Sequence, residues 1–272
     1  MIQTPWRQPP LTREQEHRLF MLLLADDTED APWMVMGDLQ FWSASGFAQS
    51  LRAYAHEQGL AWYVAAMLPI TFRWPGVPTV RTLAPDTFVS FVPERARTSY
   101  DLEAEGVFPP FVLEVVSPSS KQRDHEQKLE AYGLLGVREY ALFTPREGNA
   151  STLDGYRRGV GGALEPWAPD AQGRLWSDAL GLYLVVRGVF VQAETPEGRL
   201  LLTPEQEAEG RRRAEEERAH EVRARRQAEE ARRQAEQGRR QAEQGRRQAE
   251  EDAARLRQEL EHLRQQGGGN AE

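Results

Sequence analysis

The stretch FVLEVVSPSSKQRDHEQKLEAYGLLGVREYALFTP, residues 111–145, contains two strand patterns separated by one helix pattern. FVLEVV (111–116) is a short, nearly continuous apolar run, which is typical of a buried central strand. HEQKLEAYGLL (125–135) has apolar residues at helical spacing and is followed by Gly136, a residue suited to a helix C-cap. REYALFTP (138–145) predicts a second strand, closed by proline.

The flanking residues extend this alternation of helices and strands. Residues 11–25 and 43–58 predict two helices, and Gly59 ends the second one. The stretch LAWYVAAMLPITFRW (60–74) is strand-like, and TFVSFV (87–92) alternates as a strand does. Two or three more strands are predicted after Pro145, at 153–159, 181–188 and 189–194. The order predicts an α/β (α+β) domain in which a mixed sheet lies between helices.

Composition divides the chain near residue 203. Aromatic and β-branched residues are spread through residues 1–203 and almost vanish from 204–272, where Arg, Gln, Ala and Glu dominate. We therefore expect an N-terminal helical extension at 1–30, one globular domain at 31–203, and a charged helix at 204–272 with a flexible Gly-rich end. About 200 residues are ample for one hydrophobic core.

The C-terminal segment repeats RRQAEEA, RRQAEQG, RRQAEQG and RRQAEED over residues 225–252. Alanine recurs every seven residues, and the residue three places later is Ala, Gly or Asp. A strong coiled coil needs large apolar residues at both positions, and each internal Gly costs the helix about 1 kcal/mol. Two outcomes remain open, which are a weak homodimer through this helix and a single solvated helix with partial disorder.

Charge and cysteine content restrict the function. The chain has no Cys, so disulfides and thiolate metal sites are excluded, and a reducing intracellular setting fits. The apolar run at 19–25 is too short to span a membrane, so we expect a cytoplasmic protein with no membrane partner. Residues 1–203 hold 18 basic and 25 acidic residues, a net charge of −7. This charge opposes binding to nucleic acid through a broad positive face.

Two carboxylates form the centre of the candidate site. Glu114 lies in the middle of an apolar strand, where a carboxylate is costly to bury unless it is paired or ligates a cation. Asp86 follows a proline directly before another strand, so the two carboxylates converge if their strands are neighbours. Such oxygen ligands suit Mg²⁺ or Mn²⁺. A divalent cation held there could polarise a phosphoryl group and activate a water molecule.

Lysine is scarce in this chain and points to a third member of the site. Of the 34 basic residues only Lys121 and Lys128 are lysine. Lysine is a compact donor that can lose its proton, whereas arginine stays charged. Lys128 lies on the helix after the Glu114 strand and could bind a scissile phosphate or orient water, with Lys121 as its rival. Each of the three residues also has a structural alternative. Lys128 could form an exposed pair with Asp124, Glu114 could form a salt bridge to a buried Arg, and Asp86 could be a turn residue after proline.

These residues also carry a resemblance to a known family. The sequence from Ala84 to Pro145, within a broader match over about residues 35–200, resembles the Uma-two family of endonucleases, a branch of the PD-(D/E)XK superfamily. The sharpest matches are Pro85-Asp86, the run Glu114-Val115-Val116-Ser117-Pro118-Ser119, Lys128, Tyr132 and Gly136-Val137.

The resemblance implies a restriction-endonuclease-like mixed β-sheet flanked by helices, with the site at one sheet edge and DNA as the substrate. It implies that Asp86 and Glu114 bind Mg²⁺, helped by the Val115 carbonyl, and that Lys128 is catalytic. The superfamily usually places its lysine two residues after the glutamate, and here that position is Val116. The closing strand has Thr144 where the family often has Asp.

Other chemistries find little support in the sequence. The five His residues form no HxxxH pair, there is no Gly-rich phosphate loop, and Ser117 and Ser119 lack a recognisable His and Asp constellation. The sequence therefore predicts a Mg²⁺- or Mn²⁺-dependent endodeoxyribonuclease that hydrolyses phosphodiester bonds. One alternative is a catalytically inactive nuclease-fold protein that binds or scaffolds and assembles through its C-terminal helix. Another is that this helix is itself a partner-binding arm.

Overall fold

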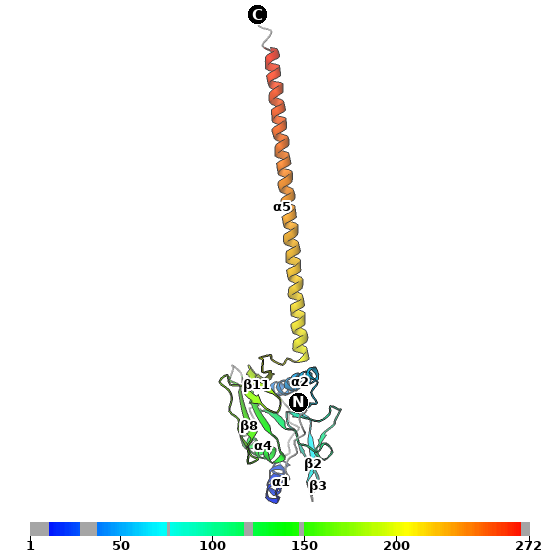
Figure 1. Ribbon diagram of the computed structural model, residues 1–272, viewed down its shortest axis with the longest axis vertical. Helices are drawn as coiled ribbons and strands as arrows, with labels where there is room; N and C mark the ends of the chain where they lie inside the picture. Colours follow the sequence, from blue (N-terminus) through cyan, green and yellow to red (C-terminus); the bar gives the residue numbers. More distant parts are fainter. Residues whose placement is uncertain (1–10, 28–36, 75–76, 117–121, 147–149, 268–272) are drawn as a thin grey trace. The chain divides into compact units, whose positions relative to one another are not determined.

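The computed structural model describes residues 11–27, 37–74, 77–116, 122–146 and 150–267 (Figure 1). Contacts divide the chain into two compact units, Met1–Glu207 and Ala208–Glu272. The first unit contains sheets and helices of the mixed α/β class. None of the helices in the described part of the chain combines the length and the apolar content needed to cross a lipid bilayer.

A six-stranded sheet forms the centre of the first unit. Its strand order is β1-β4-β6-β7-β8-β9, and only the neighbours β6 and β7 are parallel. Parallel neighbours need a crossover connection, and α4 (Gln122–Leu135) supplies it. The strands are β1 (Tyr63–Ala66), β4 (Thr87–Ser90), β6 (Phe111–Val115), β7 (Glu139–Thr144), β8 (Thr152–Arg158) and β9 (Leu164–Pro166).

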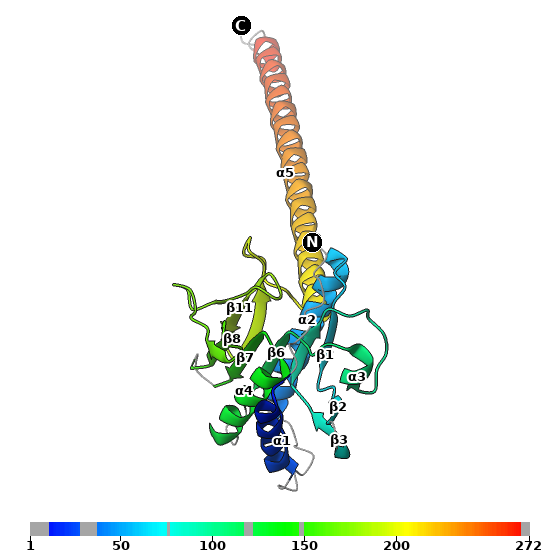
Figure 2. The same ribbon diagram turned by 60° about the horizontal axis from the view of Figure 1, so that its bottom comes forward.

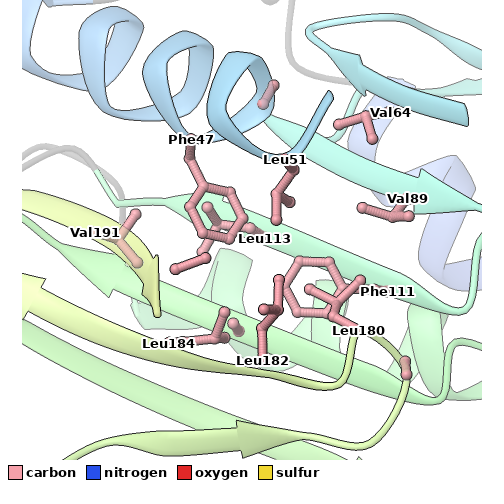
Figure 3. Packing of buried hydrophobic residues seen from close by; sticks show 14 of the residues in the cluster. Phe47, Leu51, Val64, Val89, Phe111, Leu113, Leu180, Leu182, Leu184 and Val191 are labelled. Atoms are coloured by element: carbon pink, nitrogen blue, oxygen red, sulfur yellow. The ribbon is translucent and has the colours of Figure 1, made fainter. Parts of the chain in front are cut away.

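One face of this sheet is covered by α2 (Asp38–Gln58) and by a three-stranded antiparallel sheet. In Figure 3, Phe47 and Leu51 of α2 point toward the strand residues Phe111 and Leu113. Leu182, on the smaller sheet, packs into the same cluster. The strands of the smaller sheet are β10 (Leu175–Ser177), β11 (Leu182–Arg187) and β12 (Phe190–Glu194).

The opposite face is covered by α1 (Arg13–Asp27), α4 and a second small sheet. Figure 2 shows α1 beside α4, where Leu19 is fully buried and Arg18 Nε lies 2.7 Å from Glu130 Oε1. The N-terminal helix is therefore part of the packed core. The second small sheet has the order β3-β2-β5, with β2 (Ile70–Trp74), β3 (Val77–Leu83) and β5 (Tyr100–Asp101), and α3 (Leu102–Glu105) follows it.

The side chains of β6 lie alternately on the two faces of the six-stranded sheet, which decides the face on which Glu114 lies. Phe111, Leu113 and Val115 belong to the cluster under α2, whereas Val112 belongs to the cluster under α4. Successive side chains of a strand point to opposite faces. Glu114 therefore faces α4 together with Val112.

The strand-like stretch at 60–74 contains two strands, β1 and β2. Tyr63–Ala66 and Ile70–Trp74 belong to different sheets. Met67, between them, has a φ of 53°, the only positive φ of a non-glycine residue among those described, and Pro69 follows. The first strand ends there because a left-handed residue and a proline interrupt the extended backbone.

Two other boundaries also differ from the predicted ones. Helix α2 begins at Asp38, five residues before the predicted start, and β4 ends at Ser90 rather than at residue 92. The extra helical turn contains Gln40, Phe41 and Trp42, of which Phe41 and Trp42 are largely exposed. Their exposure hides the amphipathic pattern that would have marked this turn.

Helix α5 (Pro204–Gly267) contains the heptad repeats. Thr203 and Gln206 form a capping box at its start, since each backbone N–H is bonded by the other side chain. Exposed Arg–Glu pairs four residues apart run along it, including Arg225–Glu229 at 3.3 Å and Arg240–Glu236 at 2.7 Å. The residues of α5 from Glu205 to His262 are exposed. Homodimer formation through this helix stays a prediction.

Candidate functional site

The site lies where β4 begins and β6 ends. These antiparallel neighbours pair Thr87 with Leu113. The next pair in the same register is Asp86 with Glu114, so the two carboxylates are placed opposite one another by the sheet itself. The strands are thus neighbours, which is the condition the sequence set for the carboxylates to converge.

Asp86 is held by contacts from two other elements. The residue is 8% exposed. The backbone N–H of Val115 donates to Asp86 Oδ2 at 2.6 Å, and Gln40 Nε2 on α2 lies 3.5 and 3.4 Å from the two carboxylate oxygens. Burial, and then the negative charge of Glu114, raises the pKa of Asp86 to about 7, against the opposing effects of Val115, Lys128 and Gln40.

Glu114 is held by two donors from one face of α4. The Tyr132 hydroxyl donates to Glu114 Oε1 at 2.7 Å, and Lys128 Nζ lies 3.2 Å from Glu114 Oε2. Residues four apart share a helix face, which is why Lys128 and Tyr132 both reach the strand below. Burial raises the pKa of Tyr132 well above its usual value, so its hydroxyl stays protonated and acts as the donor.

The structure therefore brings Asp86, Glu114 and Lys128 together. Glu114 is paired with Lys128 and Tyr132 rather than with a buried Arg. Asp86 lies in a bend directly before β4, where it is buried and accepts from the Val115 N–H. Val115 meets Asp86 through its N–H, and the ligand role of its carbonyl stays a prediction.

Some sequence-based candidates lie outside the described residues. Lys121, the rival of Lys128, is one of them, as are Ser117 and Ser119. The side chain of Asp124 is likewise outside the described part. Its predicted pairing with Lys128 and the choice between the two lysines therefore stay predictions.

Two contacts of the site were missed at the level of sequence. Gln40 lies before the predicted start of α2, and nothing local marks it as a partner of a residue 46 positions away. Tyr132 appears in the family resemblance but was given no role. Its spacing of four residues from Lys128 was the available clue, because it places both side chains on one helix face.

The donor set can be tested against a divalent cation. Among the described residues no three His, Cys, Asp or Glu side chains gather, so the protein would offer two carboxylates and a backbone carbonyl. Mg²⁺ is usually bound by one or two carboxylates together with waters and substrate phosphates. Burial, and then the negative charge of Glu114, raises the pKa of Asp86, and a bound cation would favour the charged carboxylate against both effects. These residues fit such an ion.

Comparison with known proteins gives a family match. A family model described as "Uma2: Putative restriction endonuclease" matches residues 32–187, more than half of the chain. A similar solved structure is described as a crystal structure of "a putative nuclease belonging to DUF820 from Anabaena variabilis ATCC 29413". It is 19% identical in sequence, with a TM-score of 0.37, and the match covers 51% of this chain and 72% of that one. No curated protein matches the chain.

Proposed function

The chain belongs to the Uma2 family of putative restriction endonucleases, and from this premise we propose that it is a metal-dependent endonuclease that hydrolyses phosphodiester bonds in DNA. The observation that carries the proposal is the convergence of Asp86, Glu114 and Lys128 from three separate elements. Two acidic oxygen donors and one amine in a buried corner are the groups that such a hydrolysis needs.

Asp86 and Glu114, with the Val115 carbonyl, would hold Mg²⁺ or Mn²⁺. Bound there, the cation would polarise the phosphoryl group and lower the pKa of a water molecule. Val115 N–H and Gln40 orient the Asp86 carboxylate, since both lie against its oxygens. These contacts hold one ligand in place before any substrate arrives.

Lys128 supplies positive charge where the substrate needs it. Its side chain is 32% exposed while its ammonium lies against Glu114. It can therefore meet a phosphate from solvent without leaving the site. A lysine binds phosphate as a point charge. In a domain with a net charge of −7 over residues 1–203, such local charge takes the place of a broad basic face.

Incubation with supercoiled plasmid DNA and Mg²⁺ tests the proposal. The wild-type protein should nick or linearise the plasmid, and Asp86→Ala should abolish cleavage. Glu103→Gln is the control, because this exposed carboxylate pairs with Arg73 on the surface and its loss should leave cleavage unchanged. A wild-type protein without Mg²⁺- or Mn²⁺-dependent cleavage would contradict the proposal, and cleavage by Asp86→Ala would show contamination or a wrong site.

The acidic charge favours one second candidate, an inactive nuclease-fold protein that binds or scaffolds. Titration with Mn²⁺ separates the two, because a scaffold needs no cation at Asp86 and Glu114. The assembly role belongs to α5 in this candidate. Sedimentation of the full chain and of a chain ending at residue 207 tests it, since equal monomeric behaviour would leave α5 without such a role.

A further inference from the structure

We propose that Tyr132 is a positioning residue of this site, holding one oxygen of Glu114 so that the other is presented beside Lys128. The inference rests on the proposed function and assigns a role to a residue that touches neither phosphate nor cation. The two oxygens of Glu114 have different partners: Oε1 accepts from the Tyr132 hydroxyl at 2.7 Å, and Oε2 lies 3.2 Å from Lys128 Nζ.

The position of the Tyr132 hydroxyl is set by the core and not by the site. The residue is 1% exposed. Its ring packs between Phe108, at 6.4 Å between ring centroids, and Tyr140, at 5.2 Å. A tyrosine side chain with a fixed ring has one place for its oxygen, so the hydroxyl is a rigid donor.

Glu114 needs such a donor because its last torsion is soft. The terminal torsion of a carboxylate is broad, with no narrow staggered wells. Lys128 is a flexible and partly exposed partner, so its ammonium moves with the carboxylate. Tyr132 stops this rotation through a charge-assisted hydrogen bond, which is about twice as strong as a neutral one. The Oε2 atom then keeps one direction.

Tyr140 provides a matched control for this role. It is fully buried in the same aromatic stack, and its hydroxyl has no hydrogen-bond partner among the described residues. Tyr140→Phe therefore removes the same atom from the same stack without removing a bond to Glu114. Tyr132→Phe removes the atom that makes that bond.

The experiment compares these two variants in the full chain. Mn²⁺ affinity is measured by electron paramagnetic resonance without DNA, plasmid cleavage gives kcat and KM, and thermal melting reports the fold. Tyr132→Phe should weaken Mn²⁺ binding and lower kcat by about 10–100-fold, the usual effect of losing a partner of a metal ligand. The KM for DNA should stay within about twofold, because Tyr132 does not touch substrate. Tyr140→Phe should match the wild type in Mn²⁺ affinity and in cleavage, and it should melt no lower than the wild type, because the hydroxyl that it removes is buried without a hydrogen-bond partner among the described residues.

A double-variant test keeps the inference falsifiable if Tyr132→Phe also lowers stability. In a Glu114→Gln background, Tyr132→Phe should cause no further loss of Mn²⁺ affinity, because its effect acts through the carboxylate. A full additional loss in that background would overturn the inference, as would a Tyr132→Phe protein that binds Mn²⁺ and cleaves like Tyr140→Phe. A wild-type protein with neither Asp86-dependent Mn²⁺ binding nor cleavage would instead overturn the proposed function, and the role of Tyr132 with it.

Discussion

The globular unit and α5 both contain pairs of a basic and an acidic side chain, but the two kinds of pair differ in burial. Lys128 Nζ lies 3.2 Å from a Glu114 oxygen that is buried beside Asp86, whereas Arg240 lies 2.7 Å from Glu236 on a fully exposed helix surface. The shorter pair contributes little to stability, because water and salt screen exposed charges and the ordering of two long side chains costs entropy. The distance between the charged atoms therefore does not show what a pair does in the protein. The burial of its carboxylate has to be considered as well.

The largest expected difference between the two regions is in catalysis. Glu114→Gln should lower plasmid cleavage by about 10³-fold, within the range typical for loss of an acid–base or ligand group. Glu236→Gln in α5 removes a carboxylate from the shorter, exposed pair and should leave cleavage unchanged. Initial rates in Mg²⁺ measure both, and equal effects of the two changes would break the comparison.

Burial should also make the stability of the folded protein depend on pH through Asp86. The folded pKa of about 7 exceeds the ordinary value of 3.8, so the folded state holds the proton more tightly. The free energy of unfolding of the metal-free protein therefore falls as the pH rises from about 4 to 7. Asp86→Asn should remove a penalty of at most about 4 kcal/mol at pH 8, since one pKa unit is about 1.4 kcal/mol.

Urea unfolding in a chelator at pH 4 and pH 8 measures this penalty. Asn can still accept the Val115 N–H, so the comparison isolates the charge. The free energy of unfolding gained by Asp86→Asn should be large at pH 8 and small at pH 4. Glu250→Gln, in an exposed pair with Arg246, should give no gain at either pH. An equal gain from Asp86→Asn at both pH values would contradict burial as the cause.

The identity of the basic side chain, lysine or arginine, should matter at the site of the globular unit and not in α5. Lys128→Arg should lower cleavage by about 10²-fold, because guanidinium is larger, cannot lose its proton and does not replace a compact donor at a crowded site. Arg240→Lys in α5 should change nothing measurable. Plasmid cleavage rates check both variants, and a fully active Lys128→Arg protein would mean that any cation serves at this position.

The smallest expected effect concerns the helix alone. Gly238→Ala should stabilise α5 by about 1 kcal/mol, the usual difference between these residues inside a helix. A Cβ there meets no heavy atom within 4 Å, so nothing opposes the gain. Circular dichroism during thermal melting reports it, while cleavage should stay unchanged. Loss of helix signal in Gly238→Ala would contradict a simple propensity effect.

Local patterns were enough to predict much of the fold. The helix–strand order around residues 111–145 was predicted correctly, because β6, α4 and β7 each have a clear period and a clear end. Heptad repeats marked α5 in the same way. Strands β1 and β2, which belong to different sheets, were predicted as one strand-like stretch, because no local pattern marks the left-handed conformation of Met67 between them.

The sequence by itself determined the candidate site residues: a carboxylate at Glu114 inside an apolar strand, Asp86 before another strand, and Lys128 in a chain with only two lysines among 34 basic residues. These choices rest on composition and local pattern, which need no partner. Tertiary structure alone decided that Gln40 reaches Asp86 and that Tyr132 holds Glu114. Such contacts depend on sheet register and helix packing, where a shift of one residue turns a side chain to the other face.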